Sequence, residues 1–305
     1  MSTRHELVQL DWDAFDPWSI VPVRHRLVDH PLLQSDALVE LGRRLEQRGS
    51  VRTHSDEATA ATPFNAAPRL HPNRAGAAQT LARIAEARAW MSLLNVQADP
   101  LYRTLVDEVL DGLAPGIAQR DPGMCYRGGW IFATSPRAVT PFHFDKEHNF
   151  ILQVRGHKTL YVWESRDTQA ASERARDRFH ATHSRDLLRW DEALRARARV
   201  FRLEPGQGAY MPSTSPHMVE NGDEPSLTVS FTYYTAATRR NSLLHRAHER
   251  LRNHGIEPPP VGENALLDTC LLAAFRTAAQ LRRWKAGASP QPRADSAPYA
   301  YAGMQ

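Results

Sequence analysis

The sequence predicts a mainly β protein with helices, whose core is a double-stranded β-helix (jelly roll). Three observations support this fold class. Short β-branched or aromatic runs follow one another between residues 128 and 234, turn-forming residues separate these runs, and helical patterns flank them on both sides. With 305 residues, the chain is long enough to bury a large core.

Residues 1–120 are predicted to form a mainly helical, mixed region that packs on the core. This region contains three predicted helices, over residues 35–49, 80–95 and 99–115. Ser35 can cap the first helix and Gly49 can end it, with leucines at helical spacing between them. The Thr-, Ser-, Ala- and Pro-rich stretch 50–76 predicts an irregular connection.

Residues 121–237 are predicted to form the β core. The predicted strands are residues 128–135, 149–155, 158–163, 200–204, 208–212 and 226–234. The turn signal Arg155-Gly156 indicates a hairpin between the second and third runs. A charged segment, residues 165–199, interrupts the strands and is predicted to be a helical insertion.

Residues 238–285 are predicted to form a C-terminal helical segment. Its two helices are expected on either side of the prolines at 258–260, and the second carries an apolar stripe formed by Leu267, Leu271, Ala274 and Ala278. This stripe either packs on the chain's own barrel or pairs two copies, so a homodimer through the C-terminal helices is one expected partner arrangement. Residues 286–305 are rich in Pro, Ala and Ser and predict a disordered tail.

Charge and composition exclude several classes of protein. The sequence pI is about 9.3, but the chain has only three lysines, and its arginines are spread among acidic residues, which does not favour a nucleic-acid partner. There is no long apolar run to span a membrane and no apolar region of a signal peptide, so a cytoplasmic location is expected. Two cysteines disfavour a disulfide framework or a cysteine metal site.

The triplet His143-Phe144-Asp145 is the most informative motif. If it lies in a strand, alternation places His143 and Asp145 on the same face. Pro141 is expected to end the preceding strand and to direct the chain into this site. His217 lies in the same β-rich region and directly precedes a predicted strand. Two imidazoles and one carboxylate that leave other positions open form the facial triad of non-haem Fe(II) oxygenases.

Other histidines compete for the third ligand position. His148 and His157 are too close in sequence to the triplet to arrive from a different strand, so we assign them to the lining or the surface. His180 and His183 lie in the charged insertion and are assigned to the surface. A lone histidine is usually a packed residue, and the triplet alone is a weak signal. The combination with His217 and a nearby lysine makes it specific.

Lys158 lies thirteen residues after Asp145. In a chain whose usual cation is arginine, a lysine indicates a site that needs a compact ammonium group. It could pair with the distal carboxylate of a 2-oxo acid, helped by the hydroxyl of Thr140. The alternative is a solvated hairpin lysine without a ligand.

The run from Thr140 to Lys158, with Asn149 and Gln153 between them, closely resembles the JmjC hydroxylases, which are cupin-like domains. The asparagine hydroxylase that acts on hypoxia-inducible factor is one of them. The resemblance covers residues 130–235, and the whole chain is also similar to bacterial cupin-like proteins of the jumonji type. Where this hydroxylase has a second asparagine, the chain has Ser230, so that contact departs from the pattern.

The resemblance implies an Fe(II)- and 2-oxoglutarate-dependent oxygenase. It would hydroxylate a C–H of a protein, peptide or amino-acid-like substrate, with succinate and CO2 as co-products. The implied iron ligands are His143, Asp145 and His217, and the implied 2-oxoglutarate contacts are Lys158, Thr140, Asn149 and Ser230.

Two alternatives stay open. One is a non-catalytic cupin-like ligand sensor or transcription regulator, which predicts a degraded triad or a missing cation. The other is a cupin metalloenzyme without a 2-oxo acid, which would have no need of Lys158.

Overall fold

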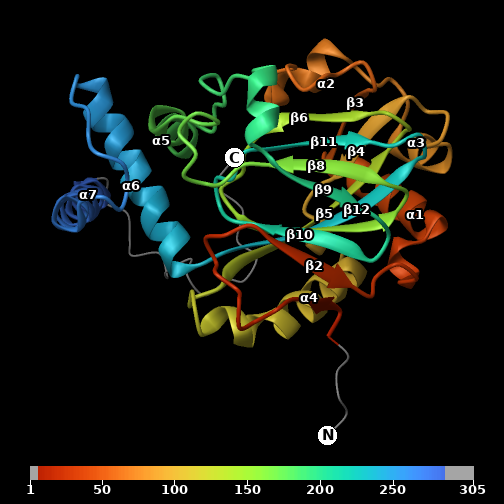
Figure 1. Ribbon diagram of the computed structural model, residues 1–305, viewed down its shortest axis with the longest axis horizontal. Helices are drawn as coiled ribbons and strands as arrows, with labels where there is room; N and C mark the ends of the chain where they lie inside the picture. Colours follow the sequence, from red (N-terminus) through yellow and green to blue (C-terminus); the bar gives the residue numbers. More distant parts are fainter. Residues whose placement is uncertain (1–5, 286–305) are drawn as a thin grey trace, which may run out of the picture.

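The computed structural model describes residues 6–285, and its strands form two antiparallel sheets that face each other (Figure 1). The larger sheet has the order β1 (Val8–Gln9), β2 (Val21–His25), β10 (Gln207–Met211), β7 (His148–Arg155), β12 (Ser226–Tyr234), β5 (Cys125–Thr134), β4 (Ala89–Leu93) and β3 (Val51–Ser55). The smaller sheet has the order β6 (Val139–His143), β11 (His217–Asn221), β8 (Lys158–Val162) and β9 (Arg199–Leu203). The predicted jelly-roll core is therefore confirmed.

Helices surround these sheets. They are α1 (Ser35–Glu46), α2 (Ala67–Leu70), α3 (Ala77–Ala82), α4 (Pro100–Ala118), α5 (Glu173–Thr182), α6 (Ala236–Asn253) and α7 (Ala265–Lys285). Short 3-10 helices occur at Pro31–Leu33, Phe64–Ala66, Val96–Ala98 and Glu192–Arg197. In Figure 1, α4 lies beneath the larger sheet, whereas α6 and α7 lie to one side of the barrel, beyond α5.

The central strand β12 is buried along its whole length because both of its faces are covered. Leu227, Val229, Phe231 and Tyr233 belong to the main apolar cluster, to which α1 and α4 also contribute. The alternate residues of β12 face the smaller sheet, and most of them are hydroxyl-bearing: Ser226, Thr228, Ser230 and Thr232. The barrel interior is therefore partly polar, which suits a binding site better than a purely structural core.

The helix predicted over residues 99–115 is confirmed, and it extends to Ala118. The Asp99 side chain accepts a hydrogen bond from the Leu101 N–H at 3.1 Å, which satisfies one of the free donors at the helix start. Pro115 lies inside the helix rather than at its end.

The N-terminal region is less helical than predicted, and the helix expected over residues 80–95 is wrong. Helix α3 ends at Ala82, and the chain then forms the strand β4, while β3 lies in the stretch predicted to be irregular. Strand β4 is buried at every position between β3 and β5. These pairings satisfy its backbone groups and override the helix propensity of the Ala-rich sequence.

The hairpin predicted at Arg155-Gly156 is also wrong, because β7 and β8 belong to different sheets. Gly156 has φ +70°, and a Cβ added there would lie 2.4 Å from the Pro225 carbonyl oxygen. Glycine therefore allows a corner at which the chain crosses from the larger sheet to the smaller one. The corner places Lys158 at the first position of β8.

The predicted helix of the charged insertion is present as α5, which begins at the cap residue Ser172 and packs on α6. Helix α7 packs on α6 rather than on the sheets (Figure 1). Of the predicted stripe on α7, Leu267, Leu271 and Ala278 are half-buried and Ala274 is exposed. The tail predicted over residues 286–305 lies outside the described residues.

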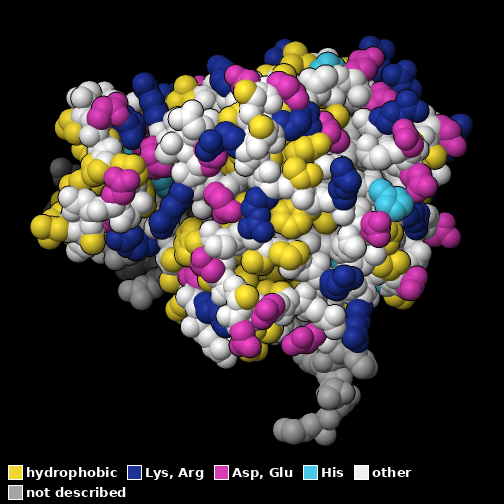
Figure 2. All heavy atoms as spheres, in the orientation of Figure 1, with side chains coloured by type: hydrophobic (Ala, Val, Ile, Leu, Met, Phe, Trp, Pro, Cys, Tyr) yellow, Lys and Arg dark blue, Asp and Glu magenta, His cyan; other side chains and the backbone are white. Residues whose placement is uncertain are grey.

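The described part of the chain contains no helix that is long and apolar enough to cross a membrane. On the face of the molecule in Figure 2, Lys and Arg side chains are interspersed with Asp and Glu side chains, and no basic stripe is visible there. Cys125 is buried and Cys270 is exposed, and neither forms a disulfide within the described residues.

Candidate metal centre

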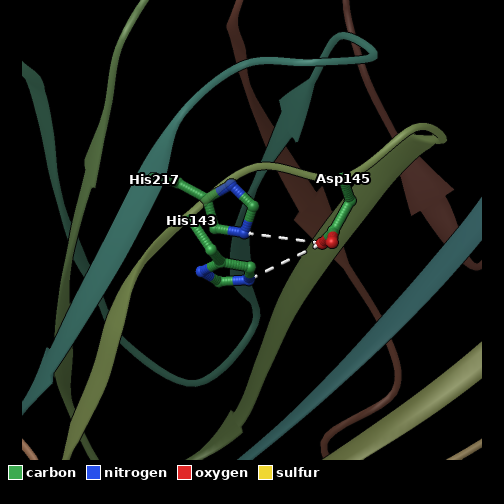
Figure 3. Close-up of side chains that lie close together, drawn as sticks. All are labelled: His143, Asp145 and His217. Carbon is green, nitrogen blue, oxygen red and sulfur yellow. Dashed lines mark ion pairs between the residues drawn. The ribbon is translucent and has the colours of Figure 1, made fainter. Parts of the chain in front are cut away.

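The structure brings His143, Asp145 and His217 together (Figure 3). His143 is the last residue of β6 and His217 is the first residue of β11, and the two are direct partners across these strands. The Asp145 Oδ2 atom lies 3.6 Å from His143 Nε2 and 3.9 Å from His217 Nε2. Within residues 6–285, this is the one group of His, Cys, Asp or Glu residues close enough to share an ion.

Asp145 does not lie on the strand, contrary to the expectation from alternation. Strand β6 ends at His143 and includes Pro141, which was expected to end a preceding strand. Hydrogen bonds from other segments hold the Asp145 loop instead: its carbonyl accepts from the Thr214 N–H at 2.8 Å, and the Phe144 carbonyl accepts from Arg185 Nε at 2.9 Å.

Both imidazoles present a free lone pair toward Asp145. His143 Nδ1 lies 2.8 Å from the Pro141 carbonyl oxygen, and His217 Nδ1 lies 3.0 Å from the Ser215 carbonyl oxygen. A carbonyl only accepts, so each Nδ1 carries the proton and each Nε2 is left to bind a metal. Burial lowers the pKa of both histidines, which keeps them neutral.

The Asp145 carboxylate stays ionised in this buried place. Burial alone would raise its pKa, but the charged Arg185 guanidinium, which donates to Asp145 Oδ1, holds the pKa below its usual value. The triad therefore offers two neutral nitrogens and one anionic oxygen.

Arg185 is a site residue that the sequence did not predict. Its Nη2 donates to Asp145 Oδ1 at 2.6 Å, and its Nη1 donates to Asn65 Oδ1 at 2.8 Å. The guanidinium carbon lies 5.0 Å from the Phe64 ring centre and 4.2 Å from the Phe179 ring centre. The charged insertion thus contributes directly to the metal centre, although nothing distinguishes Arg185 in the sequence from the other arginines.

A cavity of about 410 Å³ lies in front of His143 and Asp145. Aromatic rings form much of its wall, namely Phe64, Trp90, Trp130, Phe132, Phe179 and Tyr234. Phe64 stacks on the His143 ring with a centroid distance of 3.9 Å. A second cavity of about 520 Å³ shares Phe64, Asn65 and Arg185 with the first, so the two adjoin.

The residues predicted to contact 2-oxoglutarate divide into two groups. Asn149 and Ser230 line the 410 Å³ cavity, and the buried Asn149 Oδ1 and Ser230 Oγ have no hydrogen-bond partner among the described residues. Thr140 and Lys158 do not line it. Thr140 Oγ1 accepts a hydrogen bond of 2.8 Å from Nε1 of Trp90, which is a wall residue.

Lys158 is buried, with 5% of its surface exposed, so it is not a solvated hairpin lysine. It shares the interior face of β8 with the core residues Leu160 and Val162. Within residues 6–285, its ammonium group has no carboxylate and no hydrogen-bond acceptor as a partner. Burial lowers its pKa to about 7. An unpaired buried ammonium is costly, which indicates a site for an anion.

Lys158 lies on the same sheet as His143 and His217. Val162 is the partner of His217 across β8 and β11, and Lys158 is four residues from Val162. This separation is about 13 Å along the strand. A lysine side chain and a five-carbon diacid can span it together.

Three of the other histidines differ from their predicted places, and one of them, His183, is half-buried and lines the 410 Å³ cavity. His180 is buried rather than on the surface. His148 is fully buried and forms a 2.7 Å hydrogen bond with the Tyr210 hydroxyl, away from the triad. His157 is largely exposed, as expected for a surface residue.

Comparison with known proteins gives one family. A sequence profile described as the cupin-like domain matches residues 31–239. No curated protein matches the sequence.

Several solved structures are similar at low sequence identity. A structure of Escherichia coli YcfD has 16% identity and a TM-score of 0.48, and the match covers 89% of this chain and 68% of that one. A structure of the ribosomal oxygenase YcfD with cobalt and 2-oxoglutarate has 16% identity and a TM-score of 0.34, covering 63% of this chain and 47% of that one. The DMSP lyase DddQ of Ruegeria pomeroyi DSS-3 has 14% identity and a TM-score of 0.23, covering 36% and 39%.

Proposed function

Because the chain belongs to the family of cupin-like domains, we propose that it is an Fe(II)- and 2-oxoglutarate-dependent oxygenase. It hydroxylates a C–H of a protein, peptide or amino-acid-like substrate and releases succinate and CO2. One observation carries this proposal: the unpaired buried Lys158 lies on the same sheet as the two histidines of the His-Asp-His triad. A metal site that takes no 2-oxo acid has no use for that ammonium.

The donor set of the triad fits iron. Two neutral imidazole nitrogens and one carboxylate are the ligands of non-haem Fe(II) oxygenases, and they leave positions open for the co-substrate and O2. Bound iron supplies the oxidative chemistry that couples decarboxylation of the 2-oxo acid to C–H oxidation. Arg185 donates a hydrogen bond to Asp145 Oδ1, which leaves Oδ2 to face the two imidazoles.

The polar interior fits 2-oxoglutarate. The Lys158 ammonium pairs with the distal carboxylate in a charge-assisted bond. Thr140 accepts from Trp90 Nε1, so its own hydroxyl proton is free to donate to the same carboxylate. Asn149 and Ser230 line the cavity with unpartnered oxygens, and their amide and hydroxyl protons can be donated to the bound diacid.

The walls of the cavity keep water away from the reacting centre. The aromatic rings of Phe64 and Trp90 stand beside the triad, and Phe64 covers one face of His143. An apolar wall raises the strength of the polar contacts made inside it.

The binding steps are tested without oxygen. Addition of Fe(II) and 2-oxoglutarate to the anaerobic protein should produce the metal-to-ligand charge-transfer absorption of a chelated 2-oxo acid. Lys158→Ala should lose this band while still binding iron. Thr159→Ala, which changes a side chain on the opposite face of the same strand, serves as the control.

The alternatives give different results. Iron binding without the band would indicate a cupin metalloenzyme that takes no 2-oxo acid. Formation of the band, followed by no production of succinate when O2 is admitted, would indicate a ligand sensor. Either result contradicts the oxygenase.

A further inference from the structure

The cavity in front of the triad carries more positive than negative side chains. Its cations are Arg52, Lys146 and Arg185, and its carboxylates are Asp145 and Glu147. Asp145 pairs with Arg185 at 2.6 Å. In the part of the chain that the structure describes, neither Arg52 nor Lys146 forms an ion pair with a carboxylate.

Arg52 is held in place but not neutralised. It lies on β3, its guanidinium carbon is 4.1 Å from the Phe64 ring centre, and its Nη2 donates to the Phe64 carbonyl. Its Nε is buried and has no hydrogen-bond partner among residues 6–285. Burial and the nearby charge of Arg185 lower its pKa to about 10, so it stays charged at neutral pH.

Lys146 is also buried, and among residues 6–285 it forms no ion pair with a carboxylate, although the nearby charge of Glu147 favours its charged form. Its Nζ donates to the His180 carbonyl at 3.3 Å and lies 3.2 Å from His183 Nδ1. It also lies 4.9 Å from the Phe179 ring centre. These contacts orient the ammonium group, but they do not offset its charge.

Loading the site does not remove the positive excess. Fe(II) and the 2-oxoglutarate dianion carry equal and opposite charges, and Lys158 adds one more positive charge to the interior. A buried charge without a partner lowers the stability of the fold. A further anion bound in the loaded cavity would therefore be stabilising.

We propose that this cavity recognises a substrate whose reacting part bears a carboxylate, of the aspartyl or glutamyl class. Arg52 is the residue that binds the substrate carboxylate, and Lys146 adds positive charge beside it. The inference rests on the proposed oxygenase function. The reaction balances as substrate C–H, O2 and 2-oxoglutarate giving C–OH, succinate and CO2.

The size of the cavity agrees with such a substrate. A volume of about 410 Å³ lies at the lower end of the range for small-molecule sites. It suits an acidic side chain beside the co-substrate. The adjoining cavity of about 520 Å³ would receive flanking residues if the acidic group belongs to a polypeptide.

The experiment compares acidic probes with their amides. The iron-loaded protein with 2-oxoglutarate is given N-acetyl amides of Glu, Gln, Asp, Asn and Lys, free L-glutamate and L-aspartate, and tripeptides centred on Glu or Gln. Perturbation of the anaerobic charge-transfer band reports binding. Succinate and product mass report turnover in air. Acidic probes should bind at least tenfold more tightly than their amides, and a preference for tripeptides over free amino acids would indicate a polypeptide source.

Variants test whether Arg52 causes the preference for acidic probes over their amides. Arg52→Gln should reduce the acid-to-amide ratio severalfold, and Arg52→Lys should restore part of it, because the charge returns without the planar fork. Arg137→Gln removes an exposed arginine paired with Asp223 and should keep the wild-type ratio. Circular dichroism checks that each variant is folded.

Three results would overturn the inference. One is equal or tighter binding of the amide or lysine probes. Another is an unchanged ratio in Arg52→Gln. The third is an Arg52→Gln variant whose only defect is weaker 2-oxoglutarate binding without any probe, because Arg52 would then serve the co-substrate. Failure of the band to form in the wild-type protein would instead contradict the proposed function itself.

Discussion

The Lys158 ammonium lies on a strand face that it shares with the buried residues Leu160 and Val162. At this residue, stability and function oppose each other. The unpaired charge lowers the stability of the ligand-free fold, and in the proposed function the same charge binds the carboxylate of the co-substrate. Substitutions here should therefore separate the two effects.

Lys158→Met should raise the melting temperature of the ligand-free protein by a few degrees, because it removes a buried unpaired charge. The same variant should bind 2-oxoglutarate at least about 30-fold more weakly, since a buried charge pair is worth 2 kcal/mol or more. Thermal melts and calorimetric titration measure the two quantities. A lower melting temperature together with unchanged affinity would contradict the role of Lys158.

The affinity for 2-oxoglutarate should depend on pH through Lys158. Its folded pKa of about 7 lies below the unfolded value of 10.5, so the unfolded chain binds more protons between these pH values. Stability of the ligand-free protein therefore rises with pH across this window. Binding of 2-oxoglutarate needs the ammonium form, so affinity should fall as pH rises above 7, with proton uptake on binding. Calorimetry in buffers of different ionisation enthalpy measures that uptake, and its absence above pH 8 would contradict the account.

The residues that lie near one another in sequence were predictable. His143, Asp145 and Lys158 fall within one short run, and His217 was found by its place in the β-rich region. Arg52, Phe64 and Arg185 were not found. They come from a strand, a 3-10 helix and an insertion that only the fold brings to the cavity, and no motif marks them.

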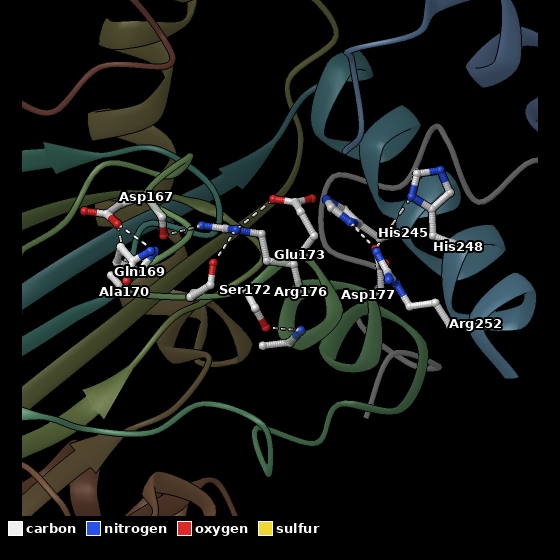
Figure 4. Close-up of polar contacts among 12 residues, drawn as sticks. Asp167, Gln169, Ala170, Ser172, Glu173, Arg176, Asp177, His245, His248 and Arg252 are labelled. Atoms are coloured by element: carbon white, nitrogen blue, oxygen red, sulfur yellow. Dashed lines mark hydrogen bonds and ion pairs between the residues drawn. The ribbon is translucent and has the colours of Figure 1, made fainter. Parts of the chain in front are cut away.

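Helix α5 is the element that supports Arg185, and buried polar contacts fix it to α6 (Figure 4). Asp177 on α5 is fully buried, and its two oxygens lie 2.7 Å from His245 Nδ1 and 2.7 Å from Arg252 Nε. Asp177 therefore shares its charge between two partners on α6, which anchors the insertion beside the metal centre.

Asp177→Ala should destabilise the protein by about 3 kcal/mol, because His245 and Arg252 lose the carboxylate that they share in a buried place. Arg252 keeps a contact with Glu257, which limits the loss. Asp186→Ala should cost less than about 1 kcal/mol, since Asp186 is exposed and its pair with Arg178 is 3.7 Å apart. Urea unfolding compares the two variants, and equal losses would contradict an anchoring role for Asp177.

Elements were predictable where local pattern and packing agree. Helix α4 has an apolar face and a capping Asp99, and β12 has a strong run of β-branched and aromatic residues. Strand β4 was mistaken for a helix because its Ala-rich surroundings favour one, while its strand form depends on pairing with β3 and β5. The corner at Gly156 was mistaken for a hairpin because both kinds of turn use an Arg-Gly sequence of this type.

At the scale of the whole molecule, α6 and α7 lie outside the barrel (Figure 1), and α7 leaves two leucines exposed to water. Leu266 is 77% exposed and Leu281 is 53% exposed, both on α7. We propose that two copies associate through the C-terminal helices, an arrangement in which these exposed leucines would be covered.

The wild-type protein should therefore be a dimer by light scattering at micromolar concentration. Leu266→Glu combined with Leu281→Glu should shift it to a monomer, because each change places a charge in the apolar contact. Leu101→Glu, at a 60% exposed leucine on α4, serves as the control and should stay dimeric. A monomeric wild-type protein would contradict this proposal without affecting the metal centre.

The most direct test of the central proposal is release of labelled CO2 from 1-¹⁴C-2-oxoglutarate in air with Fe(II). The wild-type protein should release the label, and His217→Ala, which removes one nitrogen of the triad, should not. Wild-type protein that releases no label, or His217→Ala protein that releases as much as wild type, would contradict the assignment of His143, Asp145 and His217 as the iron site of a 2-oxoglutarate oxygenase.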